Sequence, residues 1–219
     1  MSAPEAEEAT VKTPEDCLRY VEEVGFCTWR YRPQTFGIPS LEMATPWRGG
    51  EVTNQTWFWK DDLHIERKLY FGMLLAPDVP VFVSLAFLPA LIAAQGDIDA
   101  RTLHEKGLLA SNALRVYEHI ERVGPTATAA LPWPPGSRML YLATLQQKFL
   151  LTKFDLTGRT RGNYGYRWCL CEDAFPDSFE AAARIEVPRA REQVVAHLNR
   201  QGAKLTPPQV ARLFRWQPL

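Results

Sequence analysis

Hydrophobic residues in the second half of the chain follow first a helical and then a strand spacing. Over residues 99–124 they recur every three or four positions, as on the buried faces of one or two helices. A short helix of small residues is predicted over 125–131, and after a Trp-Pro-Pro-Gly turn Ser137 can cap a third helix. Residues 150–171 then alternate between apolar and polar on either side of a basic, Gly-rich turn, which predicts a β-hairpin.

Helix, short helix, turn, helix and hairpin is the element order of a winged helix. In this helix-turn-helix variant the third helix usually enters the major groove of DNA. We therefore predict a winged helix-turn-helix domain over residues 99–175. Helix-turn-helix folds also serve as dimerisation modules, so the element order alone leaves a role in protein–protein contact open.

The first half of the chain predicts a smaller α/β region over residues 13–97. An amphipathic helix begins at Thr13 and ends at Gly25, and an irregular stretch rich in Pro, Gly and Trp follows it. A second helix is predicted from Asp61 to about Tyr70.

A strand pair and another helix complete this region. Two apolar runs, 71–75 and 81–84, flank a Pro-Asp-Val-Pro turn, which is the pattern of two paired strands. Ser84 can then cap a helix that runs to about Gln95.

The ends of the chain differ in character from its centre. Residues 1–12 are expected to form a disordered acidic leader, and residues 176–219 a helical tail that packs against the winged-helix domain. No internal repeat is visible in the sequence. The fold class that we predict is therefore α+β: an N-terminal α/β region, a winged helix and C-terminal helices.

Charge is unevenly distributed along a chain whose net charge is zero. The 219 residues carry 25 Lys+Arg and 25 Asp+Glu. Residues 1–23 have a net charge of −5, residues 24–100 of −2, residues 101–171 of +6 and residues 172–219 of +1. The basic block coincides with the predicted winged helix, and such asymmetry points to nucleic acid or another acidic partner, although a basic solvated face gives the same pattern. The zero total favours a local contact with DNA over strong non-specific coating.

The predicted third helix and wing carry the side chains that could contact duplex DNA. Lysine and arginine there would bind phosphates, which gives salt-sensitive affinity without sequence preference. Two glutamines on the third helix could pair with adenine edges, although a solvated helix face explains them as well. The predicted DNA-binding residues are Arg138, Gln146, Gln147, Lys148, Lys153, Arg159, Arg161 and Arg167.

Few sequence features point to catalysis. The four histidines have no metal-binding spacing, and P-loop, dinucleotide and Gly-x-Ser-x-Gly motifs are absent, so no metal or cofactor is predicted. The densest polar run, residues 60–68, could place Asp61 and His64 on one helix face, but an exposed, ion-paired face explains it better. The adjacent Trp-Phe-Trp run, residues 57–59, is either a base-stacking platform or a core anchor.

The cysteines and the start of the chain indicate a reducing compartment. Four cysteines in a chain of this length do not form a disulfide framework, and Cys169 and Cys171 are expected in the core. No signal-peptide pattern opens the sequence, and the uncharged stretch 79–96 contains two prolines and is short for a membrane span. We therefore expect a cytoplasmic protein without a membrane role.

The first half of the chain also carries a family resemblance. Trp57-Phe-Trp-Lys60-Asp61, then Glu66-Arg-Lys68 and Tyr70-Phe-Gly72, ahead of a wing-type second half, resembles uncharacterised bacterial proteins related to the AlkZ-type winged-helix DNA glycosylases. The resemblance covers roughly residues 14–175. It implies a DNA-binding architecture of several winged helices and, for true glycosylases, removal of alkylated or crosslinked bases with a Gln-x-Gln catalytic motif. This sequence has no Gln-x-Gln, so no catalytic residue is carried over.

Three hypotheses for function follow from these patterns. The first is a non-enzymatic protein that binds duplex DNA through the third helix and the basic wing, with a link to DNA damage. The second is a glycosylase-like enzyme with a diverged site, in which a carboxylate such as Asp61 or Glu66 is the general base. The third is a winged helix used only for protein–protein contact, whose basic wing is a solubilising surface.

Overall fold

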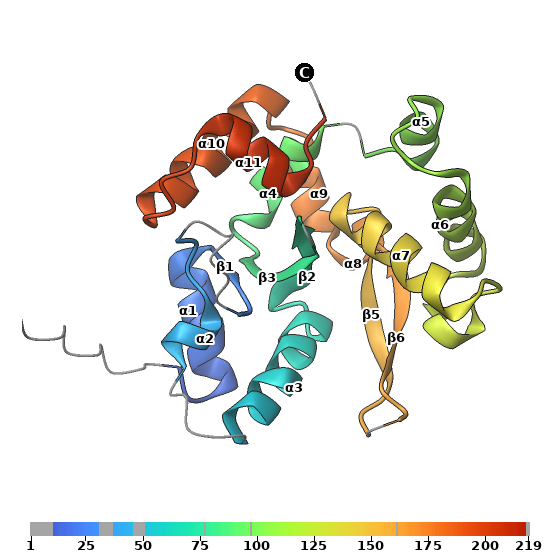
Figure 1. Ribbon diagram of the computed structural model, residues 1–219, viewed down its shortest axis with the longest axis horizontal. Coiled ribbons are helices and arrows are strands. Elements are labelled where there is room, and N and C mark those ends of the chain that lie inside the picture. The colour runs from blue at the N-terminus through green and yellow to red at the C-terminus, as the bar shows by residue number, and fades with distance from the viewer. Residues whose placement is uncertain are drawn as a thin grey trace, which may run out of the picture.

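The fold is mixed α+β, as predicted, with helices around two small antiparallel sheets (Figure 1). The computed structural model describes residues 11–30, 37–45, 51–76, 78–96, 98–160 and 162–217, and of residues 51–56 only the backbone. One of the predicted DNA contacts, Arg161, lies outside the described residues.

The first half of the chain builds a three-stranded sheet. Its elements are α1 (Pro14–Val24), β1 (Phe26–Thr28), α2 (Leu41–Ala44), α3 (Glu51–Ile65), β2 (Leu69–Leu75) and β3 (Val79–Ser84). Strand β3 pairs antiparallel with both neighbours, so the strand order is β1-β3-β2. The β2–β3 pair confirms the strand pair predicted from the two apolar runs.

Helix α1 begins and ends where its sequence predicts. The Thr13 hydroxyl accepts the N–H of Asp16 at 3.1 Å, and the Asp16 carboxylate accepts the N–H of Thr13, which is a capping box. At the other end Gly25 has a φ of 70° and donates its N–H to the carbonyl of Val21. Glycine suits this position because it adopts positive φ at little cost.

The helix predicted from Asp61 to Tyr70 is wrong, because α3 starts and ends earlier and β2 begins before that stretch is complete. The chain turns at Arg67, which has a φ of 58° and donates its N–H to the carbonyl of His64. Glycine usually makes a left-handed turn of this kind at a helix end. Because this position is an arginine, residues 60–68 contain no glycine that would indicate the end of the helix.

The second half of the chain contains the predicted hairpin. Its elements are α5 (Ala100–Glu105), α6 (Ser111–Val123), β4 (Thr126–Ala127), the 3-10 turn η2 (Thr128–Ala130), α7 (Pro135–Gln147), β5 (Leu151–Gly158) and β6 (Gly165–Leu170). The predicted short helix over 125–131 is instead a strand of two residues and a single 3-10 turn. Helix α7 starts before Ser137, and Pro134 occupies the capping position.

The two halves repeat one topology that the sequence does not reveal. Each runs through a helix, a strand, a short helix or turn, a long helix and two strands, and the second sheet has the order β4-β6-β5, which matches β1-β3-β2. The long helices α3 and α7 also end alike, since Phe149 has a φ of 55° and donates its N–H to the carbonyl of Gln146, as Arg67 does to His64. We call α1–β3 the first unit and α6–β6 the second unit.

Each unit packs its long helix against the other unit's sheet. Helix α7 lies on β2, and α3 lies on β5. The equivalent residues Gln146 and His64 both take part: Gln146 Oε1 accepts the N–H of Met73 at 2.9 Å, and His64 Nε2 lies 3.0 Å from the carbonyl oxygen of Lys153. The units are therefore joined by reciprocal contacts.

The remaining helices are α4 (Leu88–Gln95), α8 (Cys171–Ala174), α9 (Pro176–Ala182), α10 (Val187–Arg200) and α11 (Pro207–Phe214). Of these, α8 packs on β5 and β6 of the second unit, and the others lie over the first unit. Helix α10 packs along α4, and α11 contacts β2, where the N–H of Ala76 donates to the carbonyl of Leu213 at 2.8 Å. The expectation that both last helices pack against the second half is therefore wrong for α10 and for the main contact of α11. Nearly every residue of α4 is buried, so this helix needs cover on several sides, and α10 supplies part of it.

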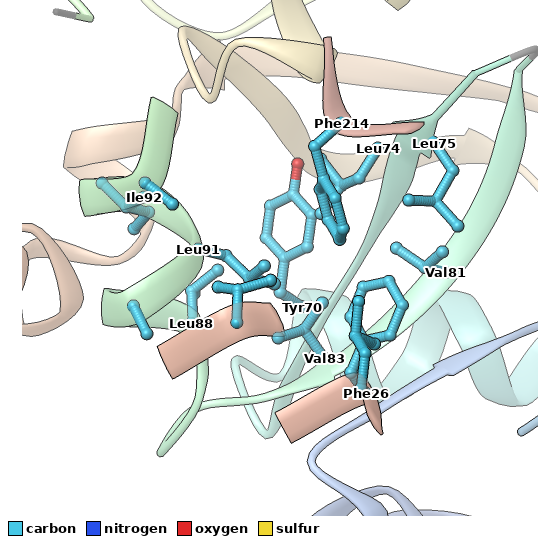
Figure 2. Packing of buried hydrophobic residues seen from close by; sticks show 14 of the residues in the cluster. Phe26, Tyr70, Leu74, Leu75, Val81, Val83, Leu88, Leu91, Ile92 and Phe214 are labelled. Carbon is cyan, nitrogen blue, oxygen red and sulfur yellow. The ribbon is translucent and has the colours of Figure 1, made fainter. Parts of the chain in front are cut away.

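A central core lies between the sheet of the first unit and these helices. Figure 2 shows Phe26 and Tyr70 from the sheet facing Leu91 of α4 and Phe214 of α11. The rings of Phe26 and Phe214 are 5.6 Å apart. Phe149 of the second unit belongs to the same buried cluster, so the core crosses from one unit to the other. Within the described residues, no helix is long and apolar enough to cross a membrane.

Candidate nucleic-acid interface and a buried polar seam

Three of the predicted DNA contacts lie at the surface of the second unit. Arg167 on β6 is exposed, and Arg138 in the first turns of α7 is half-buried. The side chain of Arg159, at the end of β5, is also exposed and forms an ion pair with Asp62 on α3. Lys148 is half-buried at the end of α7, where burial and then repulsion from Arg215 lower its pKa.

The two glutamines of α7 lie in the interior of the structure. Gln146 is 1% exposed and bonds to β2, and Gln147 is 5% exposed and donates its amide to the Asp78 carboxylate at 3.1 Å. Arg215 donates to the other end of the Gln147 amide. Neither side chain can reach a base edge in this arrangement, because the face of α7 that carries them packs against the first unit. Their role as DNA contacts stays a prediction that this placement does not favour.

Lys153 is also buried, although its place on the wing predicts a phosphate contact. Its ammonium lies 4.4 Å from the ring centres of Phe71 and Tyr166. Burial, and then repulsion from Lys60, lowers the pKa of Lys153 to about 7, against an opposing contribution from Asp61. An amine with this pKa is partly neutral near pH 7, which is compatible with its aromatic surroundings.

The surroundings of Lys153 form a cluster that we call the polar seam, because it lies where α3 meets the β5–β6 hairpin. Its members are Lys60, Asp61, Lys153, Tyr164 and Tyr166. Lys60 and Asp61 form an ion pair of 2.6 Å, and their side chains are 3% and 0% exposed. The Lys60 ammonium also donates to both tyrosine hydroxyls, each at 3.1 Å, and the Tyr166 hydroxyl donates to Asp61 Oδ1 at 2.9 Å.

The seam satisfies its charges almost entirely with its own members. The ammonium of Lys60 has three oxygen partners, and each oxygen of Asp61 accepts one hydrogen bond. Burial lowers the pKa of Lys60, while Asp61 acts in the opposite direction. Two lysines face a single carboxylate, so an arrangement with one amine neutral balances the charge of the seam.

His64 fixes the backbone beside the seam. Its Nδ1 accepts the N–H of Phe71 at 2.9 Å, so the ring proton lies on Nε2, which faces the carbonyl oxygen of Lys153. The ring is fully buried, and burial, followed by repulsion from Lys153 and Arg67, holds the pKa of His64 well below its usual value. Neutral His64, with both ring nitrogens in hydrogen bonds, thus links β2 to β5.

The expectation that residues 60–68 form an exposed, ion-paired face is therefore wrong for its first half. Lys60, Asp61 and His64 are buried because the hairpin of the second unit covers α3 at these positions. The expectation is correct for the end of the run, where Glu66 pairs with Lys68 at 2.7 Å and both side chains are about half exposed.

The Trp-Phe-Trp run is part core anchor and part surface, and its role as a base-stacking platform stays a prediction. Trp59 is buried in the core of the first unit, whereas Trp57 and Phe58 are 38% and 36% exposed. The ring of Trp57 lies 5.2 Å from Trp29 and 5.7 Å from Tyr164, and the Lys60 ammonium lies 4.5 Å from its centre. Trp57, which contacts Lys60 and Tyr164 of the seam, is thus partly open to solvent.

Sequence reasoning missed Lys60, Tyr164 and Tyr166 as parts of a site. Alternation along the return strand places Tyr166 and Trp168 on the face opposite Arg167, which could have indicated a buried tyrosine. Nothing local indicates that this tyrosine meets a lysine from the other unit, because the two residues are far apart in the sequence.

The predicted core positions of Cys169 and Cys171 are confirmed, since both are buried free thiols. Burial raises the pKa of Cys169 to about 11. Among the described residues, no three His, Cys, Asp or Glu side chains are grouped so that they could hold a metal ion.

Comparison with known proteins relates nearly the whole chain to one family. The model of the family described as AlkZ related matches residues 11–215. No curated protein and no solved structure matches the chain. The match spans both units and the helices that follow them, and the chain belongs to the AlkZ-related family.

Proposed function

We propose that this protein is a DNA-binding protein built from two winged-helix units and connected with the repair of damaged bases. The observation that carries the proposal is the repeated topology: in each unit one strand follows the first helix and two follow the long helix, and the sheet has the order first strand, third strand, second strand. A winged helix has this arrangement and usually places its third helix, here α3 or α7, in the major groove. Membership of the AlkZ-related family supports the connection with base repair.

The second unit offers a DNA contact because its third helix is partly open. The N-terminal half of α7 is exposed, with Met139 at 56% and Leu140 at 64%. Apolar side chains of this kind contact thymine methyl groups or wedge between base steps. Arg138 beside them and Arg167 on β6 supply positive charge for the phosphates.

A fluorescence anisotropy titration with a labelled duplex tests this proposal. We expect the natural chain to bind at about 50 mM salt and to lose affinity steeply towards about 200 mM. Arg138→Ala combined with Arg167→Ala should weaken binding about tenfold or more and reduce the salt slope by up to about two. The control is Arg189→Ala with Arg212→Ala, two exposed arginines on α10 and α11. Equal loss in both double variants, or no binding by the natural chain, would refute the proposed surface.

Base excision is a second candidate function, favoured by the family and by the ionisable groups gathered in the polar seam. Both oxygens of Asp61 are occupied by protein partners, whereas a general base must reach a water molecule. Asp61 is a base only if the hairpin withdraws from α3. The other carboxylate considered, Glu66, is exposed but pairs with Lys68 at the surface.

Release of bases from an alkylated duplex by the purified chain tests this second function. Loss of release in Asp61→Asn, with duplex binding retained, would assign the chemistry to the seam. Glu66→Gln is the matched control, since this carboxylate lies outside the seam. Absence of base release at all enzyme concentrations would leave DNA binding as the sole function proposed.

A further inference from the structure

A polar hollow of about 340 Å³ lies on the second unit, between α6 and the loop that precedes α7. Four of its side chains come from α6 and recur every three or four residues, which places them on one face of the helix. The lining residues are Arg115, Glu118, His119, Arg122, Pro132 and Trp133. None of them belongs to the polar seam or to the DNA contacts proposed above.

Trp133 forms an aromatic wall of this hollow and is held from three sides. Its carbonyl accepts a hydrogen bond from Arg138, which fixes the backbone of the loop. The guanidinium of Arg115 lies 5.9 Å from the centre of the ring, and His119 meets the ring edge-on at 6.1 Å. The indole is half-buried, so part of its surface remains open to a ligand.

The hollow carries a net positive charge because Arg115 and Arg122 outnumber its single carboxylate, Glu118. Glu118 lies 3.8 Å from Arg101, which also pairs with Glu121 at 2.5 Å. Arg115 and Arg122 are both exposed, and neither forms an ion pair with any residue that the structure describes. Two free guanidinium groups and an indole therefore face the same space.

We propose that this hollow binds the phosphate group of a nucleotide or a polynucleotide. The phosphate lies between Arg115 and Arg122, because guanidinium groups match phosphate oxygens with paired hydrogen bonds. The attached base stacks on Trp133, as bases do on exposed aromatic side chains. The site does not depend on duplex binding by α7 and the wing.

Isothermal titration calorimetry of the full chain tests the proposal with five probes: inorganic phosphate, deoxyadenosine, deoxyadenosine 5′-monophosphate, and a dinucleotide with and without a 5′-phosphate. We expect the monophosphate to bind and deoxyadenosine not to bind. Arg115→Ala combined with Arg122→Ala should weaken the monophosphate at least tenfold. Arg189→Ala with Arg212→Ala removes the same charge from α10 and α11 and should leave its affinity unchanged.

Further outcomes separate the parts of the proposal. Trp133→Phe should abolish the tryptophan fluorescence change on binding while the monophosphate still binds. If inorganic phosphate binds as tightly as the monophosphate, the stacking of the base is refuted. Tighter binding of the phosphorylated dinucleotide than of its unphosphorylated form assigns the site to a terminal phosphate, and equal binding assigns it to the internal phosphodiester.

The proposal is overturned if monophosphate and deoxyadenosine bind alike, or if the Arg115/Arg122 variant binds like the natural chain. If circular dichroism shows that this double variant has a lower melting temperature than the natural chain, the single substitution Arg122→Gln at an exposed position replaces it. Duplex binding is measured in parallel, so that a chain that binds the monophosphate but no duplex refutes the proposed function and supports the hollow.

Discussion

Replacing Asp61 with asparagine keeps the shape of the side chain and removes the only carboxylate of the polar seam. The ion pair with Lys60 is 2.6 Å long, and neither side chain has more than 3% of its surface exposed. At an effective dielectric constant near 20, a pair at this separation attracts with about 6 kcal/mol. Part of this is offset by desolvation, and removing one partner of a buried pair costs about 3–5 kcal/mol. For a chain of 219 residues that lowers the melting temperature by roughly 6–20 °C.

Urea unfolding followed by tryptophan fluorescence at pH 7 measures this loss. Asp62→Asn is the matched control, since the neighbouring carboxylate is 36% exposed and pairs with the exposed Arg159, an interaction worth less than about 1 kcal/mol. We also expect the deficit of Asp61→Asn to shrink as the pH rises towards 10. The stranded ammonium of Lys60 then loses its proton, and a neutral amine needs no counterion. A loss below about 1 kcal/mol, equal to that of Asp62→Asn, would refute the description of Asp61 as a buried counterion.

Three further predictions concern stability and DNA binding. Lys153→Met should raise the stability of the chain near pH 7 and reduce the gain in stability between pH 7 and 10. The reason is that the pKa of Lys153 is lowered to about 7 in the folded chain, which therefore binds fewer protons over this range than the unfolded chain. Urea midpoints measured across this pH range test the prediction. Gly72→Ala should cost about 1–3 kcal/mol by thermal unfolding, because the new methyl group would lie 2.7 Å from the buried Tyr70 hydroxyl. Arg159→Ala with Arg161→Ala should weaken binding to all duplexes alike and lower the salt slope by up to about two.

Each of these predictions has an outcome that contradicts it. Parallel pH curves for the natural chain and Lys153→Met would mean that this lysine stays charged when folded. Full stability of Gly72→Ala would mean that the ring of Tyr70 moves freely. An unchanged salt slope in the Arg159/Arg161 variant would mean that these two arginines do not contact the duplex.

The sequence predicted those parts of the fold that depend on local patterns. Alternation and turn residues located both hairpins, and a capping Thr with a closing Gly located α1. The end of α3 could not be found in this way, because Arg67 holds a conformation that local preference assigns to glycine. Phe149, its counterpart at the end of α7, also has a positive φ without being glycine. The sequence therefore shows neither helix end, and the internal repeat is not visible in it.

The candidate site was less predictable because burial is decided by packing across the whole chain. Gln146, Lys153 and Lys60 look like surface residues in their own segments, since their polar ends would usually face solvent. Each becomes buried only when an element of the other unit covers it. Arg167, by contrast, is exposed as its place in the strand alternation indicates.

The reciprocal contacts between the units have a consequence for how the protein can be divided. A cut near residue 98 would strip β2 of α7 and leave His64 without the Lys153 carbonyl, and it would remove Phe149 from the central core. Each fragment would expose apolar surface and unpaired polar groups that the intact chain hides. The two units are thus repeats in topology but not autonomous modules, and we expect the chain to unfold in a single cooperative transition.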